Sequence, residues 1–218
     1  VSDWLLEAEV VLPTGEVITA GSRASKTSAG YNLKDLVVGS EGTLGVITQA
    51  TMQLTGVPEQ VWGGRAVFSD LESASAAVVD AVQSGVDVAK IELVDALSAE
   101  ISNDYLDTGL PDAPMVFLEF HDNHGIEREV EFCRAIFEEH GVEQLEIVEN
   151  DTEMADLWKA RRELADAFEP WDPDLSPLTP GDVTVQMSEY TEIVTHAKEL
   201  GEEYGITVPC FGHAGDGN

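Results

Sequence analysis

The sequence predicts an α+β protein that contains a ferredoxin-like βαββαβ unit. From Val61 onward, short β-branched stretches alternate with helical stretches in the order strand, helix, strand, strand, helix, strand. An irregular segment, "TGVPEQ" at 55–60, separates this unit from a strand-rich first part. The split βαββαβ order places both helices on one face of an antiparallel sheet.

The strand-rich first part is predicted from alternating apolar residues. Residues 4–19 predict two strands joined by the turn "PTGE", and residues 44–54 predict a third strand. A glycine-rich segment, "GSEGTLG" at 39–45, comes just before the third strand.

The elements after Val61 follow from changes of hydrophobic period. The βαββαβ strands are predicted at 61–68, 86–93, 113–121 and 142–148, and its helices at 71–85 and 125–141, with a short helix inserted from Asp95. After Asn150 we expect a helix at 151–170, a Pro-rich loop at 169–182, a strand at 183–187, a helix at 188–205 and a strand at 206–212. The spacing of Cys133 in the helix at 125–141 predicts a core position.

Charge is the strongest global signal. The chain has 42 acidic and 11 basic residues, for a formal net charge of −31. A compact domain with this charge repels itself in dilute buffer, and salt screens the repulsion. We therefore expect a halophilic protein, with an ordinary acidic protein as the alternative. A nucleic-acid partner is disfavoured because no basic stripe is present to neutralise phosphates.

The sequence also gives expectations about the cellular location of the protein and about whether it is part of a longer chain. No apolar run is long enough to span a membrane, the first residues are no signal peptide, and Cys133 and Cys210 lie outside any CxxC pattern. We expect a cytoplasmic protein, with a peripheral position at the inner membrane face as the alternative. The absence of an initiator Met suggests a piece of a longer protein.

Two motifs carry the functional signal. They are "KTSAGYNLKDLVVGSEGTLGVIT" at 26–48 and "GHAGDGN" at 212–218. In this order, the sequence resembles the FAD-linked oxidases of the vanillyl-alcohol-oxidase type, which include D-lactate, glycolate and D-2-hydroxyglutarate dehydrogenases. The resemblance implies that residues 1–56 are the C-terminal part of an FAD-binding domain. It implies that residues 57–218 form most of a substrate-binding cap domain, truncated at its C-terminus.

The first motif implies a cofactor site. By resemblance, the FAD wall is formed by Gly39, Ser40, Glu41, Gly42, Thr43, Gly45, Val46 and Ile47. Glycines permit close backbone approach and positive φ, and peptide N–H groups can face a pyrophosphate. A Gly-rich turn of structural use alone is the alternative. Tyr31 and Lys34 are expected to pack or cap nearby. The sequence has no GxGxxG, so a nicotinamide site has no support.

The second motif implies a catalytic and metal-binding histidine. In the resembling dehydrogenases the first His of this loop binds a divalent metal that holds the hydroxy acid, which here implies His213 with Zn or Mn. A histidine satisfied by ordinary polar contacts is the alternative. Asn218 is a weaker candidate that would face the flavin or the substrate.

A third motif, "LWKARREL" at 157–164, supplies a candidate carboxylate clamp. The resemblance assigns the substrate arginine to Arg161, with Arg162 as its neighbour, because a planar guanidinium binds a carboxylate bidentately. A surface ion pair is the alternative. We interpret His140 as a cation at a helix C-terminus. We interpret His121 and His124 as loop polar residues in preference to a metal pair.

The sequence also departs from the family pattern. Pro180 stands near the place of a lysine in the hydroxyglutarate enzymes, and Gln186 occupies the place of a proline. A dicarboxylic substrate would then lack a cation for its second carboxylate. A monocarboxylate such as D-lactate or glycolate is favoured.

The predicted function is therefore part of an FAD-dependent 2-hydroxy-acid dehydrogenase or oxidase that moves a hydride from substrate Cα to flavin N5. Its partners would be a small 2-hydroxy acid and an electron acceptor that the sequence does not identify, and a homo-oligomer is left open. Two alternatives are an alkylglycerone-phosphate-synthase-like flavin transferase and a non-catalytic flavin-binding or ligand-binding remnant. We expect the 218-residue chain alone to bind flavin poorly and to be inactive.

Overall fold

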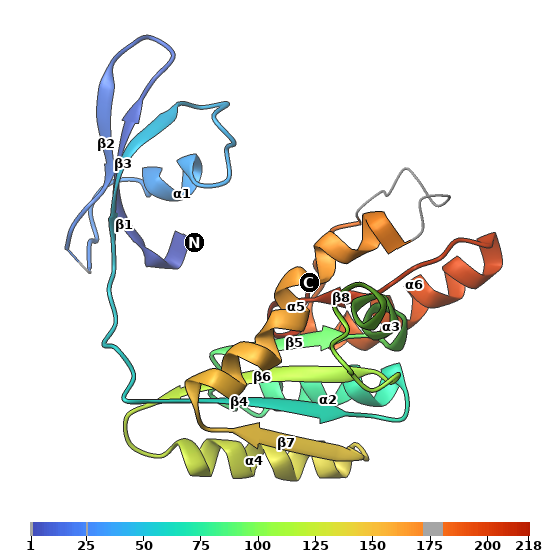
Figure 1. Cartoon of the computed structure of the whole chain (residues 1–218). Helices are drawn as coiled ribbons and strands as arrows, with labels where there is room; N and C mark the ends of the chain where they lie inside the picture. The colour runs from blue at the N-terminus through green and yellow to red at the C-terminus, as the bar shows by residue number, and fades with distance from the viewer. Residues whose placement is uncertain (1, 25, 172–180) are drawn as a thin grey trace. The chain divides into compact units, whose positions relative to one another are not determined.

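The computed structural model divides the chain into two compact units, Val1–Val57 and Pro58–Asn218. The structure describes residues 2–24, 26–171 and 181–218 (Figure 1). Each unit has its own apolar core, so each is described by itself. In these ranges no helix combines the length and the apolar character that a membrane crossing requires.

The first unit is a three-stranded antiparallel sheet with a short helix. Strand β1 (Leu5–Val11) lies between β2 (Val17–Gly21) and β3 (Val46–Met52). The helix α1 (Leu33–Val37), which the sequence analysis did not anticipate, packs against this sheet. Its small core consists of Leu5, Ala8, Val10, Ala20 and Val37.

The second unit is built on a five-stranded antiparallel sheet in the order β7-β4-β6-β5-β8. The strands are β4 (Gln60–Val67), β5 (Lys90–Val94), β6 (Met115–Asp122), β7 (Gln144–Val148) and β8 (Phe211–Gly212). The first four follow the ferredoxin-like arrangement, and β8 extends the sheet beside β5. The predicted α+β class and βαββαβ order are confirmed.

Helices cover both faces of this sheet (Figure 1). On one face lie α2 (Leu71–Gln83), α4 (Ile126–Glu139) and α6 (Tyr190–Tyr204), and on the other lie α3 (Ala96–Leu106) and α5 (Asp151–Trp171). Residues of β6 alternate between the two cores, because successive strand residues point to opposite faces. Phe120 and Cys133 are each 1% exposed in the first core, which confirms the predicted core position of Cys133.

Two aspartates fix helix starts in the second unit. Asp70 caps α2 through a 2.7 Å hydrogen bond from Ser73 N, and Asp95 caps α3 through a 2.8 Å bond from Ser98 N. A side-chain cap satisfies a backbone donor that has no partner within the helix. Asp95 is buried, and Lys198 Nζ lies 2.7 Å from its Oδ2. This ion pair therefore ties α6 to the start of α3.

Several predicted boundaries were wrong. Residues 183–187 form no strand. Val185 N donates to Gly217 O at 2.9 Å, but Gly217 is not part of a strand, and Val183 is 56% exposed. The strand predicted at 206–212 is reduced to β8, and β5 begins only at Lys90. Tyr31 does not pack, because it is 96% exposed.

The expected Pro-rich loop differs as well. Helix α5 continues to Trp171, past the predicted start of the loop at 169. Most of the loop, residues 172–180 including Pro180, lies outside the described residues.

Candidate active site

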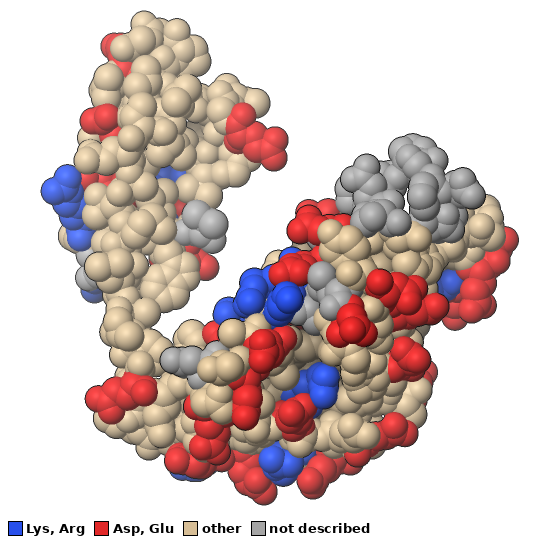
Figure 2. All heavy atoms as spheres, viewed as in Figure 1, with Lys and Arg blue, Asp and Glu red and all other residues tan. Residues whose placement is uncertain are grey.

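A pocket of about 400 Å³ lies between β5 and α5. It is lined by Lys90, Glu92, Glu119, Met154, Ala155, Trp158, Arg161, Arg162 and His213. Lys90 and Glu92 alternate along β5 and so share one face, while Trp158 and Arg161 are three residues apart on α5 and share one side of the helix. Figure 2 shows basic side chains gathered over α5, whereas acidic side chains are spread over the visible face of the second unit.

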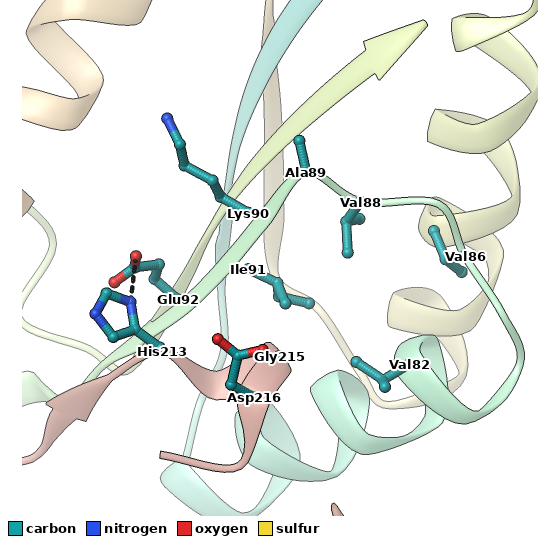
Figure 3. Close-up of a pocket in the computed structure, with 10 residues that line it drawn as sticks. All are labelled: Val82, Val86, Val88, Ala89, Lys90, Ile91, Glu92, His213, Gly215 and Asp216. Carbon is teal, nitrogen blue, oxygen red and sulfur yellow. Dashed lines mark hydrogen bonds and ion pairs between the residues drawn. The ribbon is translucent and has the colours of Figure 1, made fainter. Parts of the chain in front are cut away.

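Glu92 lies at the centre of this pocket and contacts two predicted site residues. Its Oε1 lies 2.9 Å from His213 Nδ1, and its Oε2 lies 2.5 Å from Arg161 NH2. Figure 3 shows the first contact, with the Glu92 side chain directed from β5 toward the imidazole. Because a carboxylate accepts, the neutral imidazole donates Nδ1–H and keeps its lone pair on Nε2. Glu92 therefore joins Arg161 to His213.

Arg161 is held by Glu92 and Phe211, and part of its guanidinium has no partner among the described residues. Its guanidinium carbon lies 4.8 Å from the centre of the Phe211 ring, which is a cation–π contact, and its side chain is 12% exposed. Its Nε is buried and has no hydrogen-bond partner in the described part of the chain. An arginine with a fixed plane and spare N–H groups is suited to bind a carboxylate.

A second ion pair stands beside the first. Lys90 Nζ lies 2.7 Å from Glu119 Oε1 and 5.1 Å from the centre of the Trp158 ring. His121 Nε2 lies 2.8 Å from the same carboxylate oxygen. His121 is therefore bound to a pocket residue, which the interpretation as a loop polar residue did not anticipate.

The loop that carries His213 packs closely on β5. A Cβ on Gly215 would come within 2.5 Å of Ile91 Cγ2, so a glycine is needed for this approach. A smaller cavity of about 280 Å³ shares Lys90, Glu92 and His213 with the main pocket and continues along Ile91 toward Val86 (Figure 3).

Asn218 occupies a different place from the other candidates. Its amide donates to Asp182 Oδ1 at 2.6 Å and to Thr184 Oγ1 at 3.1 Å, and it does not line the pocket that the described residues form. The structure thus brings His213 and Arg161 together through Glu92 and leaves Asn218 apart.

His140 lies far from this chemistry in the fold. It is the C-cap residue of α4, as interpreted from the sequence, and its Nε2 lies 2.7 Å from Asp80 Oδ2 on α2. It connects two helices on the opposite face of the sheet.

Burial excludes a thiolate or phenolate from the neighbourhood at neutral pH. Burial raises the pKa of the Cys210 thiol to about 11, with a further contribution from the Asp95 carboxylate. Burial likewise raises the pKa of Tyr190 above its ordinary value. Since only a thiolate is a strong nucleophile, covalent catalysis by Cys210 is disfavoured.

The described residues do not supply a complete metal site. His213 and Glu92 are two potential ligands, and nowhere in the described ranges do three His, Cys, Asp or Glu side chains group in a way that could hold a metal ion. Catalytic zinc commonly has three protein ligands. The pocket residues described here do not fit a metal without further donors.

Most residues of the glycine-rich loop of the first unit are exposed. Gly39 and Gly42 both have φ of +80°, and Glu41 has φ of 48°, which is unusual for a non-glycine residue. Gly45 is buried, and a Cβ there would come within 2.7 Å of Val10 Cγ1. The first two glycines therefore shape the loop, while Gly45 allows it to pack on β1.

Comparison with known proteins identifies the family of this chain. Residues 57–218 match the model for "FAD linked oxidases, C-terminal domain". The chain belongs to this family.

Relatives of known name align over nearly the whole chain. A Danio rerio protein named "Probable D-lactate dehydrogenase, mitochondrial" is 37% identical over 98% of this chain and 44% of its own length. The "Glycolate oxidase subunit GlcD" of Bacillus subtilis is 33% identical over 99% of this chain and 46% of its own length. The chain thus spans about half the length of these curated relatives.

Solved structures share the fold at lower identity. An "alkyldihydroxyacetonephosphate synthase" matches with a TM-score of 0.69 and 20% identity, over 93% of this chain and 40% of that one. At this identity the match shows the fold alone.

Sequence reasoning missed six pocket residues, and four of them carry charge or an aromatic ring: Lys90, Glu92, Glu119 and Trp158. A usable signal was present, because Lys90 and Glu92 place two charges on one face of a strand whose other face is apolar. Charged residues at alternate positions of a central strand are uncommon unless they are paired or functional.

Proposed function

We propose that this chain is part of an FAD-dependent dehydrogenase or oxidase of small 2-hydroxy acids, of the D-lactate or glycolate type. In this proposal residues 1–56 belong to the FAD-binding domain and residues 57–218 to the substrate-binding domain. Relatives named for these two substrates align over at least 98% of the chain. The observation that carries the proposal is Arg161, which is stacked on Phe211 and joined through Glu92 to His213 at one pocket.

The pocket residues have distinct proposed roles. Arg161 binds the substrate carboxylate with the N–H groups that Glu92 does not engage. His213, with Nδ1–H donated to Glu92, offers the Nε2 lone pair to the substrate hydroxyl and accepts its proton. FAD, when bound, would supply the hydride acceptor at N5 for the hydrogen on substrate Cα. Glu92 keeps the imidazole in the tautomer that this proton transfer requires.

A divalent metal at His213, Zn or Mn, stays a prediction from the resemblance. It would require ligands beyond His213 and Glu92, so no step above depends on it. The same Nε2 lone pair would bind such an ion. The tautomer fixed by Glu92 therefore suits His213 both for accepting a proton and for binding a metal ion.

The loop at 39–47 is the proposed FAD contact. Val46 and Ile47 are 61% and 44% exposed at its end, which leaves apolar surface for a flat ring system or another part of the protein. The electron acceptor, a homo-oligomeric state and a cytoplasmic location stay predictions.

The proposal is tested by anaerobic mixing of the natural protein, loaded with FAD, with D-lactate, glycolate and D-2-hydroxyglutarate. We expect D-lactate or glycolate to bleach the oxidised flavin spectrum, and Arg161→Met to abolish the bleaching at the same concentration. A protein that retains FAD but is reduced by none of the three acids would support the non-catalytic alternative.

A further inference from the structure

The charge of the pocket differs from that of the chain. The chain carries a net charge of −31 with only 11 basic residues, yet three of those residues, Lys90, Arg161 and Arg162, line the pocket. Two carboxylates, Glu92 and Glu119, line it as well. These five side chains carry one net positive charge, which matches a ligand with one negative charge.

The pocket charges are arranged as two neighbouring ion pairs. One pair is Arg161 with Glu92, and the other is Lys90 with Glu119. Lys90 and Glu92 are two residues apart on β5, which separates the pairs by about 7 Å along the strand. An acid whose first carboxylate binds Arg161 would therefore direct its distal end toward Lys90.

Lys90 is a cation whose charge is already neutralised. Its Nζ lies 2.7 Å from Glu119 Oε1 and rests over the Trp158 ring. The Glu119 side chain is 7% exposed and also binds His121, whereas the Lys90 side chain is 49% exposed. Glu119 is thus the buried partner with two contacts, and Lys90 is the exposed partner that could reach a ligand.

We propose that Glu119 makes the pocket selective for monocarboxylic 2-hydroxy acids. It engages Lys90, a pocket cation that could otherwise bind a second carboxylate. This inference rests on the proposed function and adds a residue that determines specificity. Glu119 acts through Lys90, as a positioning residue, and takes no part in the chemical step.

The test compares D-lactate with D-malate, which has the same hydroxyl and carboxylate plus a second carboxylate. Binding is measured by calorimetry on the natural FAD-loaded protein, with the flavin reduced beforehand so that no turnover occurs. Glu119→Gln is expected to raise the affinity for D-malate relative to D-lactate by about tenfold, the effect of one added charge-assisted hydrogen bond. The ratio of kcat/KM for the two acids should shift in the same direction.

Two further variants make the test specific. Adding Lys90→Gln to Glu119→Gln should remove the gain, because the freed lysine supplies it. Glu146→Gln is the matched control, since Glu146 is an exposed acid of the same sheet, paired with Arg65 at 2.8 Å and away from the pocket. It should leave the preference unchanged.

The results distinguish a failure of the Glu119 inference from a failure of the proposed function. A protein that binds D-lactate but keeps its preference in Glu119→Gln contradicts this inference alone, as does a gain that survives Lys90→Gln. A wild type that binds neither acid contradicts the proposed function and this inference with it.

Discussion

Glu92 and Arg161 form a nearly buried ion pair across the pocket, with Oε2 2.5 Å from NH2 and side chains that are 10% and 12% exposed. The pair joins β5, which lies between β6 and β8 in the sheet, to α5 on its surface. Removing one partner of such a pair leaves an uncompensated charge, which is more costly than the pair itself is favourable. The relationship therefore fixes both the guanidinium and the carboxylate that contacts His213.

Replacing Glu92 by Gln tests whether Glu92 orients Arg161 and His213 for catalysis. The amide keeps the shape of the side chain but loses the charge that holds Arg161 and fixes the His213 tautomer. We expect kcat/KM for the hydroxy acid to fall by about 10- to 100-fold, as for other residues that orient a functional histidine.

The tautomer itself is read from histidine ¹H–¹⁵N spectra of wild type and Glu92→Gln. Glu131→Gln is the control, because Glu131 is exposed on α4 and pairs only loosely with Arg134, at 3.5 Å. An unchanged His213 tautomer together with unchanged kcat/KM would refute the role given to Glu92.

Replacing Arg161 by Lys keeps the charge but removes the planar fork. We expect KM for D-lactate to rise by about 10- to 100-fold, because a bidentate charge-assisted contact is lost, with a smaller change in kcat. Steady-state kinetics measure this split. Arg134→Lys on α4 is the matched control and should change neither constant, and an Arg161→Lys enzyme with normal KM would exclude Arg161 as the carboxylate anchor.

Asp70 should contribute stability that depends on pH. The hydrogen bond from the Ser73 backbone N–H, followed by side-chain bonds from Ser73 and Ser69, lowers the pKa of Asp70 below 3.8. A lowered folded pKa means that the contribution is present above pH 3.8 and is lost as the pH falls through the folded value.

Urea unfolding as a function of pH measures this contribution. Asp70→Ala should cost about 1 kcal/mol at neutral pH, through loss of the α2 cap. Asp70→Asn retains a cap and should lie near the wild type there. The difference between wild type and Asp70→Ala should shrink below pH 3.8, and a difference independent of pH would show that the charged cap is not its source.

The net charge of −31 predicts salt-dependent stability. Raising KCl from about 0.1 M to 1 M shortens the screening length from about 10 Å to about 3 Å, which weakens repulsion among the acidic side chains. We expect Tm to rise steeply over this range. Sucrose at equal osmolarity serves as the control, and a Tm that responds equally to sucrose would argue against adaptation to salt.

The sequence predicted the core helices of the second unit from the period of their apolar residues. The helix expected at 125–141 is α4, because Ile126, Val130 and Cys133 recur at helical spacing and all face the core. The strand expected at 183–187 is absent, although its residues have the period of a strand. Alternation in "VTVQM" indicated a strand, but no strand within residues 2–24, 26–171 and 181–218 accepts its hydrogen bonds. A strand requires a partner that local sequence does not reveal.

The candidate site was predictable only in part. Motif spacing predicted His213 and Arg161, which are more than fifty residues apart, and the structure places both on Glu92. Glu92 itself lay inside an apparent core strand. Its role depends on how α5 and the C-terminal loop pack on β5, which are long-range contacts that no short motif encodes.

A crystal structure of the natural protein with FAD and D-lactate would show where the substrate binds. We expect the substrate carboxylate within hydrogen-bond distance of Arg161 and the substrate hydroxyl next to His213 Nε2. D-lactate bound away from both residues, with the Glu92 contacts intact, would contradict the assignment of this pocket as the substrate site.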